Sequence, residues 1–274
     1  MGTSLGVVLA KQGHEVYGLR RTPDALPECI KPVKADLTDP MSLAVIPGEL
    51  DLVYYTAATS ERSERGYRQA YVDGLSNVLE KVQGSSSHLR HVFFTSSTSV
   101  YGQTDGSWVT EESLTAPANY SGKIILEGEA LLARADVGTT SIRFGGIYGP
   151  GRTYLIRTLI ESRAGLKPSE AIFTNRIHRD DCAGFLAPLA GLDSPAPLYL
   201  GVDDDPAPYN DVMRFIANEL GMGVPPLAGE AQRDRMRGNT NKRCSNRRLR
   251  SSGYQLRYPS YREGYRELVS DYPR

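Results

Sequence analysis

The sequence has few cysteines and no excess of charge of either sign. Its three cysteines, Cys29, Cys182 and Cys244, lie far apart without a Cys-x-x-Cys pair, which argues against a disulfide scaffold and a cysteine-based zinc site. Free thiols fit a reducing compartment, so we expect a cytoplasmic protein. The 274 residues carry 32 Lys and Arg against 32 Asp and Glu, and no net field draws the chain toward nucleic acid.

Long apolar runs are also missing. None approaches the roughly 18 residues that a membrane span needs. The first residues, 1–6, have no basic region ahead of an apolar core and no small-residue cleavage site, so a signal peptide is not expected. These absences predict no membrane partner and no nucleic-acid partner, and they leave a small molecule as the expected ligand.

Short apolar or β-branched runs alternate with stretches of helical periodicity, which is the pattern of βαβ units around a parallel sheet. Strands are predicted at residues 15–19, 30–35, 52–56, 91–95, 140–144 and 198–201. Helices are predicted at residues 4–12, 61–82, 121–134, 154–164, 179–190, 210–220 and 261–272. The pattern indicates an α/β fold of the Rossmann type, with a doubly wound parallel sheet.

The order of elements at the start departs from a complete dinucleotide-binding unit. Such a unit begins with a strand and a Gly-x-Gly-x-x-Gly turn, and its helix follows. Here the helix at 4–12 comes first, and Gly2 stands where the last glycine of the turn would be. We therefore expect a fold whose first strand and most of the glycine loop are missing through N-terminal truncation. A fold that simply begins with a helix is the alternative.

The strand at 15–19 is followed by two basic residues, Arg20 and Arg21. An acidic residue at this place holds the ribose 2′-hydroxyl of NAD, whereas arginine suits the 2′-phosphate of NADP. The pair favours NADP over NAD. A solvated basic turn is the alternative.

Four further segments combine polar or small residues with the ends of predicted elements. A carboxylate there can meet an adenine amino group, small residues let a cofactor lie close, and hydroxyl and amine groups can serve proton transfer. In chain order the segments are Asp36-Leu37 after strand 30–35, Ala57-Ala58 after 52–56, Ser96-Ser97-Thr98-Ser99 after 91–95, and Tyr120-Ser121-Gly122-Lys123 at the start of helix 121–134.

In order and spacing these segments resemble the extended short-chain dehydrogenase/reductase family, and more narrowly its atypical NAD-dependent epimerase/dehydratase-like branch. Residues 71–77 (YVDGLSN), 143–151 (RFGGIYGPG) and 177–181 (IHRDD) add to the resemblance, which runs over nearly the whole chain. It implies an oxidoreductase, epimerase or dehydratase that uses NADP or NAD on a small polar substrate, with a nucleotide sugar among the candidates. The cofactor contacts that it implies are Gly2, Arg20, Arg21, Asp36, Leu37, Ala57, Ala58 and Lys123.

The same resemblance implies three catalytic residues. Ser97 would hydrogen-bond the reacting substrate oxygen, Tyr120 would act as general acid/base, and Lys123 would stabilise the phenolate and bind the nicotinamide ribose. The family spacing is Tyr-x-x-x-Lys, but Tyr120 and Lys123 are three residues apart, and Asn119 stands at the aligned position. Two alternatives therefore stay open: a surface pair without a catalytic role, and a different acid such as Tyr101.

After about residue 150 the alternation of strands and helices loosens and prolines become frequent. We expect residues 1–150 to form the NAD(P)-binding part, and residues 151–274 to form a smaller substrate-side region interleaved with the same domain. Residues 233–250 carry eight Lys and Arg, which indicates a solvated face or contact with an anionic substrate. By resemblance, helices 61–82 and 121–134 are candidates for a homodimer surface. A non-catalytic NAD(P)-sensing protein and an interaction protein remain alternatives to the enzyme.

Overall fold

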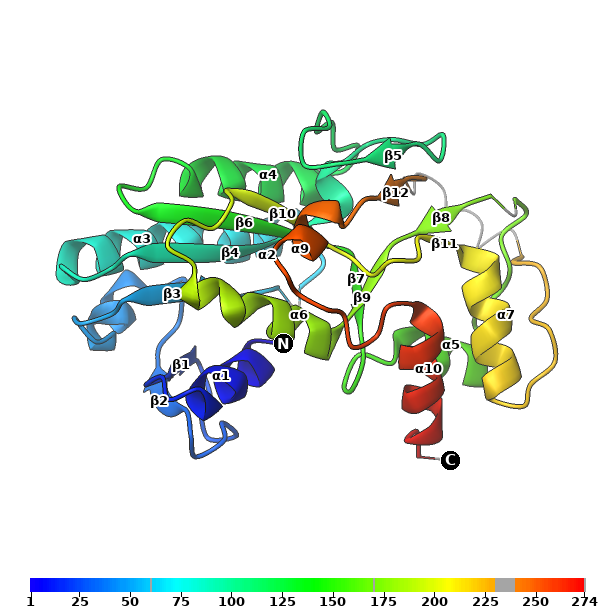
Figure 1. Cartoon of the computed structure of the whole chain (residues 1–274), viewed down its shortest axis with the longest axis horizontal. Helices are drawn as coiled ribbons and strands as arrows, with labels where there is room; N and C mark the ends of the chain where they lie inside the picture. Colours follow the sequence, from blue (N-terminus) through cyan, green and yellow to red (C-terminus); the bar gives the residue numbers. More distant parts are fainter. Residues whose placement is uncertain (60, 170, 230–239, 274) are drawn as a thin grey trace. The chain divides into compact units, whose positions relative to one another are not determined.

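The computed structural model describes residues 1–59, 61–169, 171–229 and 240–273 (Figure 1). The chain divides into two compact units. Unit 1 comprises Met1–Val100, Pro117–Arg143 and Ala183–Tyr199, and unit 2 comprises Tyr101–Ala116, Phe144–Cys182 and Leu200–Arg274. Each unit is therefore assembled from three separate stretches of sequence. The first part of the basic segment, residues 233–239, lies outside the described residues.

All six predicted strands are present, close to their predicted bounds. They are β1 (Tyr17–Arg20), β2 (Lys31–Lys34), β3 (Leu52–Tyr55), β4 (His91–Ser97), β6 (Gly138–Phe144) and β10 (Leu198–Gly201). A four-stranded sheet has the order β10-β6-β4-β3, and β1 and β2 form a sheet of their own. The pairs β1–β2 and β3–β4 are parallel. The predicted α/β fold with a parallel central sheet is confirmed.

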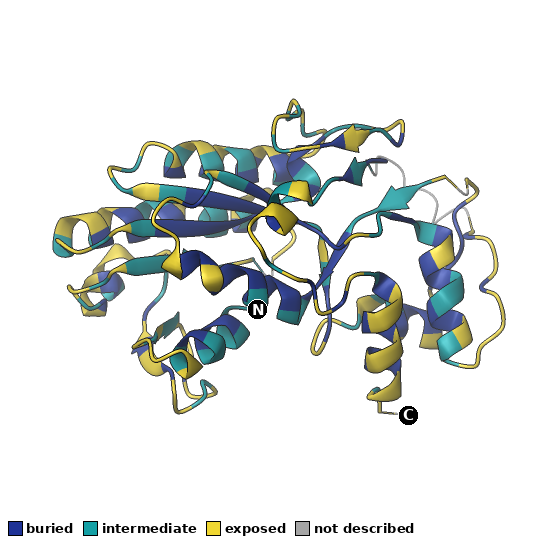
Figure 2. Ribbon diagram, in the orientation of Figure 1, coloured by how far each residue is buried: buried dark blue, intermediate teal, exposed yellow. Residues whose placement is uncertain are grey.

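The central strand β4 is buried along nearly its whole length, as Figure 2 shows. Strands of parallel sheets are covered on both faces and read as continuous apolar runs, and the central residues Val92-Phe93-Phe94 of β4 form such a run. Two aromatic pairs join β4 to β3, because the ring centroids of Tyr54 and Phe93 lie 4.6 Å apart and those of Tyr55 and Phe94 lie 5.9 Å apart. These contacts fix the register of the two strands.

The helix predicted at 61–82 is present over residues 64–85, as three consecutive helical segments. These are α2 (Glu64–Arg68), a π-helical turn (Gln69–Asp73) and α3 (Gly74–Ser85). The hydroxyl of Tyr55 on β3 donates a 2.6 Å hydrogen bond to the carbonyl oxygen of Ala70 inside the π turn. A side chain inserted against a helix in this way widens one turn, and Gly74 leaves room for the same hydroxyl.

Two more helices stand near their predicted places, α1 (Gly2–Lys11) and α4 (Tyr120–Leu132). The glycine Gly128 lets α4 pack closely on the π turn, because a Cβ there would lie 2.4 Å from the carbonyl oxygen of Tyr71. The predicted helix 179–190 is α6 (Arg179–Leu186) followed by a 3-10 turn at Pro188–Gly191.

Unit 2 is built from short strand pairs and helices around an apolar core of its own. The pairs are β5 (Trp108–Val109) with β12 (Arg243–Cys244), β7 (Gly146–Tyr148) with β9 (Arg176–His178), and β8 (Phe173–Thr174) with β11 (Ala207–Pro208). The helices are α5 (Tyr154–Ile160), α7 (Tyr209–Glu219), α9 (Arg247–Ser251) and α10 (Tyr261–Ser270). Strands of two or three residues carry no detectable alternation, and the sequence did not predict these pairs.

A buried carboxylate holds the C-terminal segment of unit 2. Asp181, on α6, is fully buried. Its Oδ1 accepts hydrogen bonds from the Tyr254 hydroxyl (2.8 Å) and the Arg257 amide (2.7 Å), and its Oδ2 accepts one from the Tyr258 amide (3.0 Å). These three donors satisfy the buried carboxylate by hydrogen bonding, and they tie the segment before α10 to α6.

Across the described parts of the chain, no helix combines the length and the apolar character that crossing a membrane requires.

Candidate functional site

The predicted cofactor residues of unit 1 follow the carboxyl ends of parallel strands. Arg20 ends β1, Asp36 and Leu37 follow β2, Ala57 and Ala58 follow β3, and Ser97 ends β4. In doubly wound sheets, ligands bind in the crevice outside the carboxyl ends of the strands. These residues therefore lie at the kind of position that binds ligands in such sheets, and their cofactor contacts stay predictions.

Gly2 opens α1 in close contact with the carboxyl end of β3. A Cβ on this glycine would lie 2.5 Å from the Oγ1 of Thr56, so any side chain would collide. The last glycine of a dinucleotide-binding turn serves this close packing of helix on strand, and the helix N-terminus then faces the pyrophosphate. The N-cap residue of α1 is Met1, whose side chain carries no hydrogen-bond acceptor of the kind that usually caps a helix. Gly2 and α1 therefore fit an NAD(P) phosphate.

Asp36 is held in a fixed orientation after β2. Its Oδ1 accepts hydrogen bonds from the amide (2.9 Å) and the hydroxyl (2.8 Å) of Thr38. These bonds, with the charge of Arg21, hold the pKa of Asp36 below its ordinary value in spite of partial burial. The result is an oriented, ionised acceptor that suits an adenine amino group.

Arg20 and Arg21 are exposed. Within the described stretches, no carboxylate forms an ion pair with either of them. Both guanidinium groups therefore remain available for a phosphate, which they can bind through paired N–H donors.

Ser97 lies half-buried at the end of β4, where a 3-10 turn (Thr98–Val100) begins. Its Oγ accepts a 3.1 Å hydrogen bond from the Ser99 amide, which fixes the hydroxyl at the strand end. The preceding residue, Ser96, is buried. Ser97 is therefore partly accessible at the end of β4, whereas the side chain of Ser96 points into the protein interior. Successive residues of a strand point to opposite faces in this way.

Tyr120 and Lys123 lie on the first turn of α4. The side chain of Asn119 caps this helix by accepting a 2.9 Å hydrogen bond from the Gly122 amide, and Tyr120 is the first helical residue. The Tyr120 hydroxyl donates to the carbonyl oxygen of Arg62 (3.1 Å), and its ring packs edge-on against Tyr67. Lys123 is exposed.

The structure places the three predicted catalytic residues on neighbouring elements without joining them. Among the residues that the structure describes, no hydrogen bond connects the side chains of Ser97, Tyr120 and Lys123. Tyr120 is 39 % exposed and can leave its bond to Arg62 by rotation of the side chain. The catalytic roles of the three residues stay predictions.

The alternative acid, Tyr101, is part of the core of unit 2. It is fully buried, and its hydroxyl donates a 2.9 Å hydrogen bond to the carbonyl oxygen of Thr110. A phenol in this position is bonded to the protein itself and serves packing.

His178, which lies in the IHRDD segment, is also packed into unit 2. Its Nδ1 accepts a hydrogen bond from the Asp180 amide (3.2 Å), and its ring centroid lies 3.9 Å from that of Tyr258. Burial lowers the pKa of His178, so the ring is a neutral acceptor at the start of α6. Over the described residues, no group of three or more His, Cys, Asp or Glu side chains is placed to hold a metal ion.

A buried ion pair that the sequence did not predict is hydrogen-bonded to Ser96, the residue before Ser97. Glu129 on α4 pairs with Arg143 on β6 at 2.6 Å, and both side chains are almost completely buried. The hydroxyl of Ser96 donates a 2.5 Å hydrogen bond to the same carboxylate. The sequence did contain a signal for this pair. Glu129 lies at helical spacing from the buried residues Ile125, Gly128 and Leu132, and an acidic side chain on a buried helix face needs a basic or hydrogen-bonding partner.

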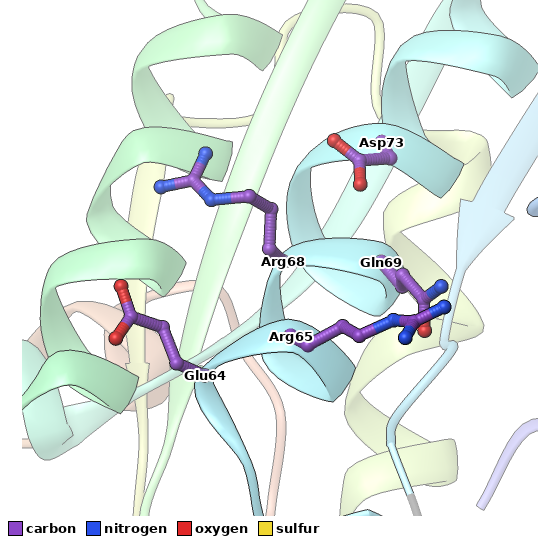
Figure 3. A pocket seen from close by; sticks show the side chains of 5 residues that line it. All are labelled: Glu64, Arg65, Arg68, Gln69 and Asp73. Atoms are coloured by element: carbon purple, nitrogen blue, oxygen red, sulfur yellow. The ribbon is translucent and has the colours of Figure 1, made fainter.

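An open hollow of about 420 Å³ lies beside α2 and the π turn (Figure 3). Five polar side chains line it: Glu64, Arg65, Arg68, Gln69 and Asp73. Arg68 also pairs with Glu127 of α4 at 2.9 Å. None of the predicted site residues belongs to this lining.

Comparison with known families gives one match by family model. The model described as the NAD dependent epimerase/dehydratase family matches residues 1–176. A curated relative, the 3-diazoavenalumate denitrifying reductase of a Streptomyces species, is 31 % identical over 156 residues, which are 52 % of this chain and 51 % of that protein. The aligned part of the chain thus spans about half the length of this relative.

Solved structures give matches over nearly the whole chain. A protein from Methylobacillus flagellatus, described as an NAD-dependent epimerase/dehydratase, is 38 % identical with a TM-score of 0.80, covering 98 % of this chain and 94 % of its own. MoeE5 in complex with UDP-glucuronic acid and NAD is 22 % identical with a TM-score of 0.81 over the same shares of the two chains.

Proposed function

Because this chain belongs to the NAD-dependent epimerase/dehydratase family, we propose that it is an NADP- or NAD-dependent enzyme acting on a small polar substrate. The observation that carries the proposal is the close approach of Gly2 to Thr56, which sets the N-terminus of α1 beside the carboxyl end of β3. The other proposed cofactor residues follow strand ends of the same unit. We assign cofactor binding to residues 1–150, which also supply Ser97 and Tyr120, and the remaining substrate contacts to residues 151–274.

Each proposed contact follows from the chemistry of its side chain. Arg20 and Arg21 bind the 2′-phosphate, which makes NADP the preferred cofactor, and Asp36 accepts from the adenine amino group. Leu37, Ala57 and Ala58 provide an apolar or small surface along the cofactor, and Lys123 binds the nicotinamide ribose. The nicotinamide, when bound, accepts or donates the hydride. Ser97 holds the substrate oxygen, and Tyr120 exchanges its proton.

We propose a nucleotide-sugar-like molecule as the substrate class. MoeE5, which shares the fold, binds UDP-glucuronic acid, and the Streptomyces relative is a reductase. The reaction is therefore proposed as reduction, epimerisation or dehydration of a carbon that bears a hydroxyl or carbonyl oxygen. Ser97 and Tyr120 would meet that oxygen in all three reactions.

Calorimetric titration with NADPH and NADH tests the cofactor site. We expect the wild-type chain to bind NADPH more tightly than NADH. Replacing Arg20 and Arg21 together by serine should weaken NADPH binding at least about tenfold and leave NADH nearly unchanged, because only NADPH offers the phosphate. The exposed Lys11→Gln variant, at the other end of α1, is the control and should match the wild type.

Two results would count against this site. An equal loss of NADPH and NADH in the arginine variant would show that Arg20 and Arg21 do not read the 2′-phosphate. If the wild type binds neither dinucleotide, the enzyme proposal fails and an interaction protein becomes the better account.

A second candidate function, a non-catalytic NAD(P)-sensing protein, is favoured by one observation. The Tyr120 hydroxyl is bonded to the Arg62 carbonyl oxygen, and the Tyr–Lys spacing is three residues instead of four. Turnover of a panel of UDP-sugars with Tyr120→Phe separates the two functions. For the enzyme, kcat should fall about 10²- to 10⁴-fold with cofactor affinity unchanged. Tyr17→Phe, another exposed tyrosine, is the control, and full activity of Tyr120→Phe would remove Tyr120 from the mechanism.

A further inference from the structure

The buried carboxylate of Glu129 joins three elements of unit 1. Its Oε1 accepts from the Ser96 hydroxyl at 2.5 Å and from the Arg143 Nε at 2.9 Å, and its Oε2 accepts from the Arg143 terminal nitrogen at 2.6 Å. The Glu129 side chain is 10 % exposed and that of Arg143 is 7 % exposed. Glu129 therefore connects α4 to β4 through Ser96 and to β6 through Arg143.

A second contact between α4 and the end of β4 is made by Gly122, which lies seven residues before Glu129 on the same face of the helix. Gly122 lies so close to the 3-10 turn after β4 that a Cβ there would be 2.6 Å from the carbonyl oxygen of Ser99. Residues seven apart on a helix are about two turns apart and share a face. The two contacts are thus made by one stripe of α4, and both reach the short segment Ser96–Ser99, which contains Ser97.

The charge of Arg143 explains why the carboxylate is held so firmly. A buried carboxylate needs a partner, and a guanidinium that donates two parallel hydrogen bonds fixes both the position and the plane of the acid. With the plane fixed, the Oε1 of Glu129 can accept from Ser96 in one geometry only. Sliding α4 along β4 would break all of these bonds together.

From this geometry we propose that Glu129 is a positioning residue, which sets the register of α4 on β4 and so the distance of Tyr120 and Lys123 from Ser97. The inference rests on the proposed function, in which Ser97 and the first turn of α4 act on one substrate. Glu129 does this through Ser96, the neighbour of Ser97 in the strand, without touching cofactor or substrate.

Two variants and two controls test the proposal. Ser96→Ala removes the bond between α4 and β4 and leaves the ion pair, and Glu129→Gln weakens both. Glu127→Gln neutralises an exposed carboxylate of the same helix, and Leu132→Val loosens the buried end of α4 away from Ser96. The first readout is hydrogen exchange of the Lys123 amide, which is bonded to the Asn119 carbonyl oxygen in the first turn.

The second readout compares NADPH with 2′,5′-ADP, a fragment that lacks the nicotinamide ribose. In Ser96→Ala and Glu129→Gln we expect the Lys123 amide to exchange about tenfold faster, as loss of one hydrogen bond to a charged group allows. NADPH binding should weaken by a similar factor, and 2′,5′-ADP binding should not change. Glu127→Gln should leave the exchange rate and the binding of both ligands as in the wild type. Leu132→Val should change the affinities for NADPH and 2′,5′-ADP by the same factor.

The outcomes distinguish this inference from the proposed function. Unchanged exchange in both variants would overturn the role of Glu129, whatever the cofactor does. Parallel weakening of NADPH and 2′,5′-ADP would also overturn it, because general loosening then explains the loss. If the wild type binds no NADPH but the Lys123 amide exchanges faster in both variants, the proposed function is refuted. The role of Glu129 in setting the register of α4 on β4 is then still supported.

Discussion

Replacing Glu129 by methionine should lower the free energy of unfolding by about 3–5 kcal/mol. The substitution leaves the guanidinium of Arg143 buried without its carboxylate, and it removes the acceptor of the Ser96 hydroxyl. Urea denaturation measures the change. An unaltered m-value, the dependence of the unfolding free energy on urea concentration, would show that stability has fallen without a change in the compactness of the folded or unfolded state. Arg143→Met should cost a similar amount, because it leaves the carboxylate unpaired instead.

The double variant Glu129→Met/Arg143→Met gives the sharper result. With both charges gone, methionines of comparable size can fill the space, and we expect stability to return to within about 1 kcal/mol of the wild type. The exposed pair of Arg68 and Glu127 is the control, since removing its carboxylate should change stability by less than about 1 kcal/mol. If the double variant loses as much stability as the two single variants together, Glu129 and Arg143 do not stabilise each other as a buried ion pair.

Asp181→Ala should destabilise the protein by about 4 kcal/mol. It removes the acceptor of the Arg257 and Tyr258 backbone amides and one acceptor of the Tyr254 hydroxyl. Asp181→Asn should cost roughly half as much, because its amide group can replace only one of the two oxygens. Thermal unfolding checks both variants, and the exposed Asp271→Ala should leave the melting temperature nearly unchanged.

A graded result would identify the part played by each bond. Tyr254→Phe removes a single hydrogen bond to the carboxylate, so about 1–2 kcal/mol should be lost. If Asp181→Ala costs no more than Tyr254→Phe, the two backbone amides must find other acceptors, and the carboxylate does not hold the segment before α10.

The sheet was predictable from the sequence because its strands are marked by local composition. The segment that forms β4 holds the apolar run Val92–Phe94, and the segments that form β3 and β6 are followed by small residues. The π turn inside the helix predicted at 61–82 was not predictable, since it depends on the hydroxyl of Tyr55, which reaches Ala70 from a distant strand. Propensity describes a helix by its own residues and misses such an intrusion.

The candidate site shows the same division. Gly2, Asp36 and Ser97 were placed at strand and helix ends by their order in the sequence, and the structure puts them there. The direction of Tyr120 was not predictable, because the Arg62 carbonyl oxygen and the ring of Tyr67 belong to a segment far away in the chain. Identification of the ion pair of Glu129 required the packing of α4, although an acid on an apolar helical stripe pointed to a buried partner.

The three-part construction of each unit has a consequence for synthesis on the ribosome. Unit 1 receives its last segment, Ala183–Tyr199, only after both of the first two segments of unit 2 have been made. A nascent chain therefore holds an incomplete sheet while later strands are still being translated, and apolar edges are exposed during that time. Pausing or chaperone binding before residue 199 should therefore influence the yield of native unit 1. The order of translation thus becomes a determinant of how this unit folds.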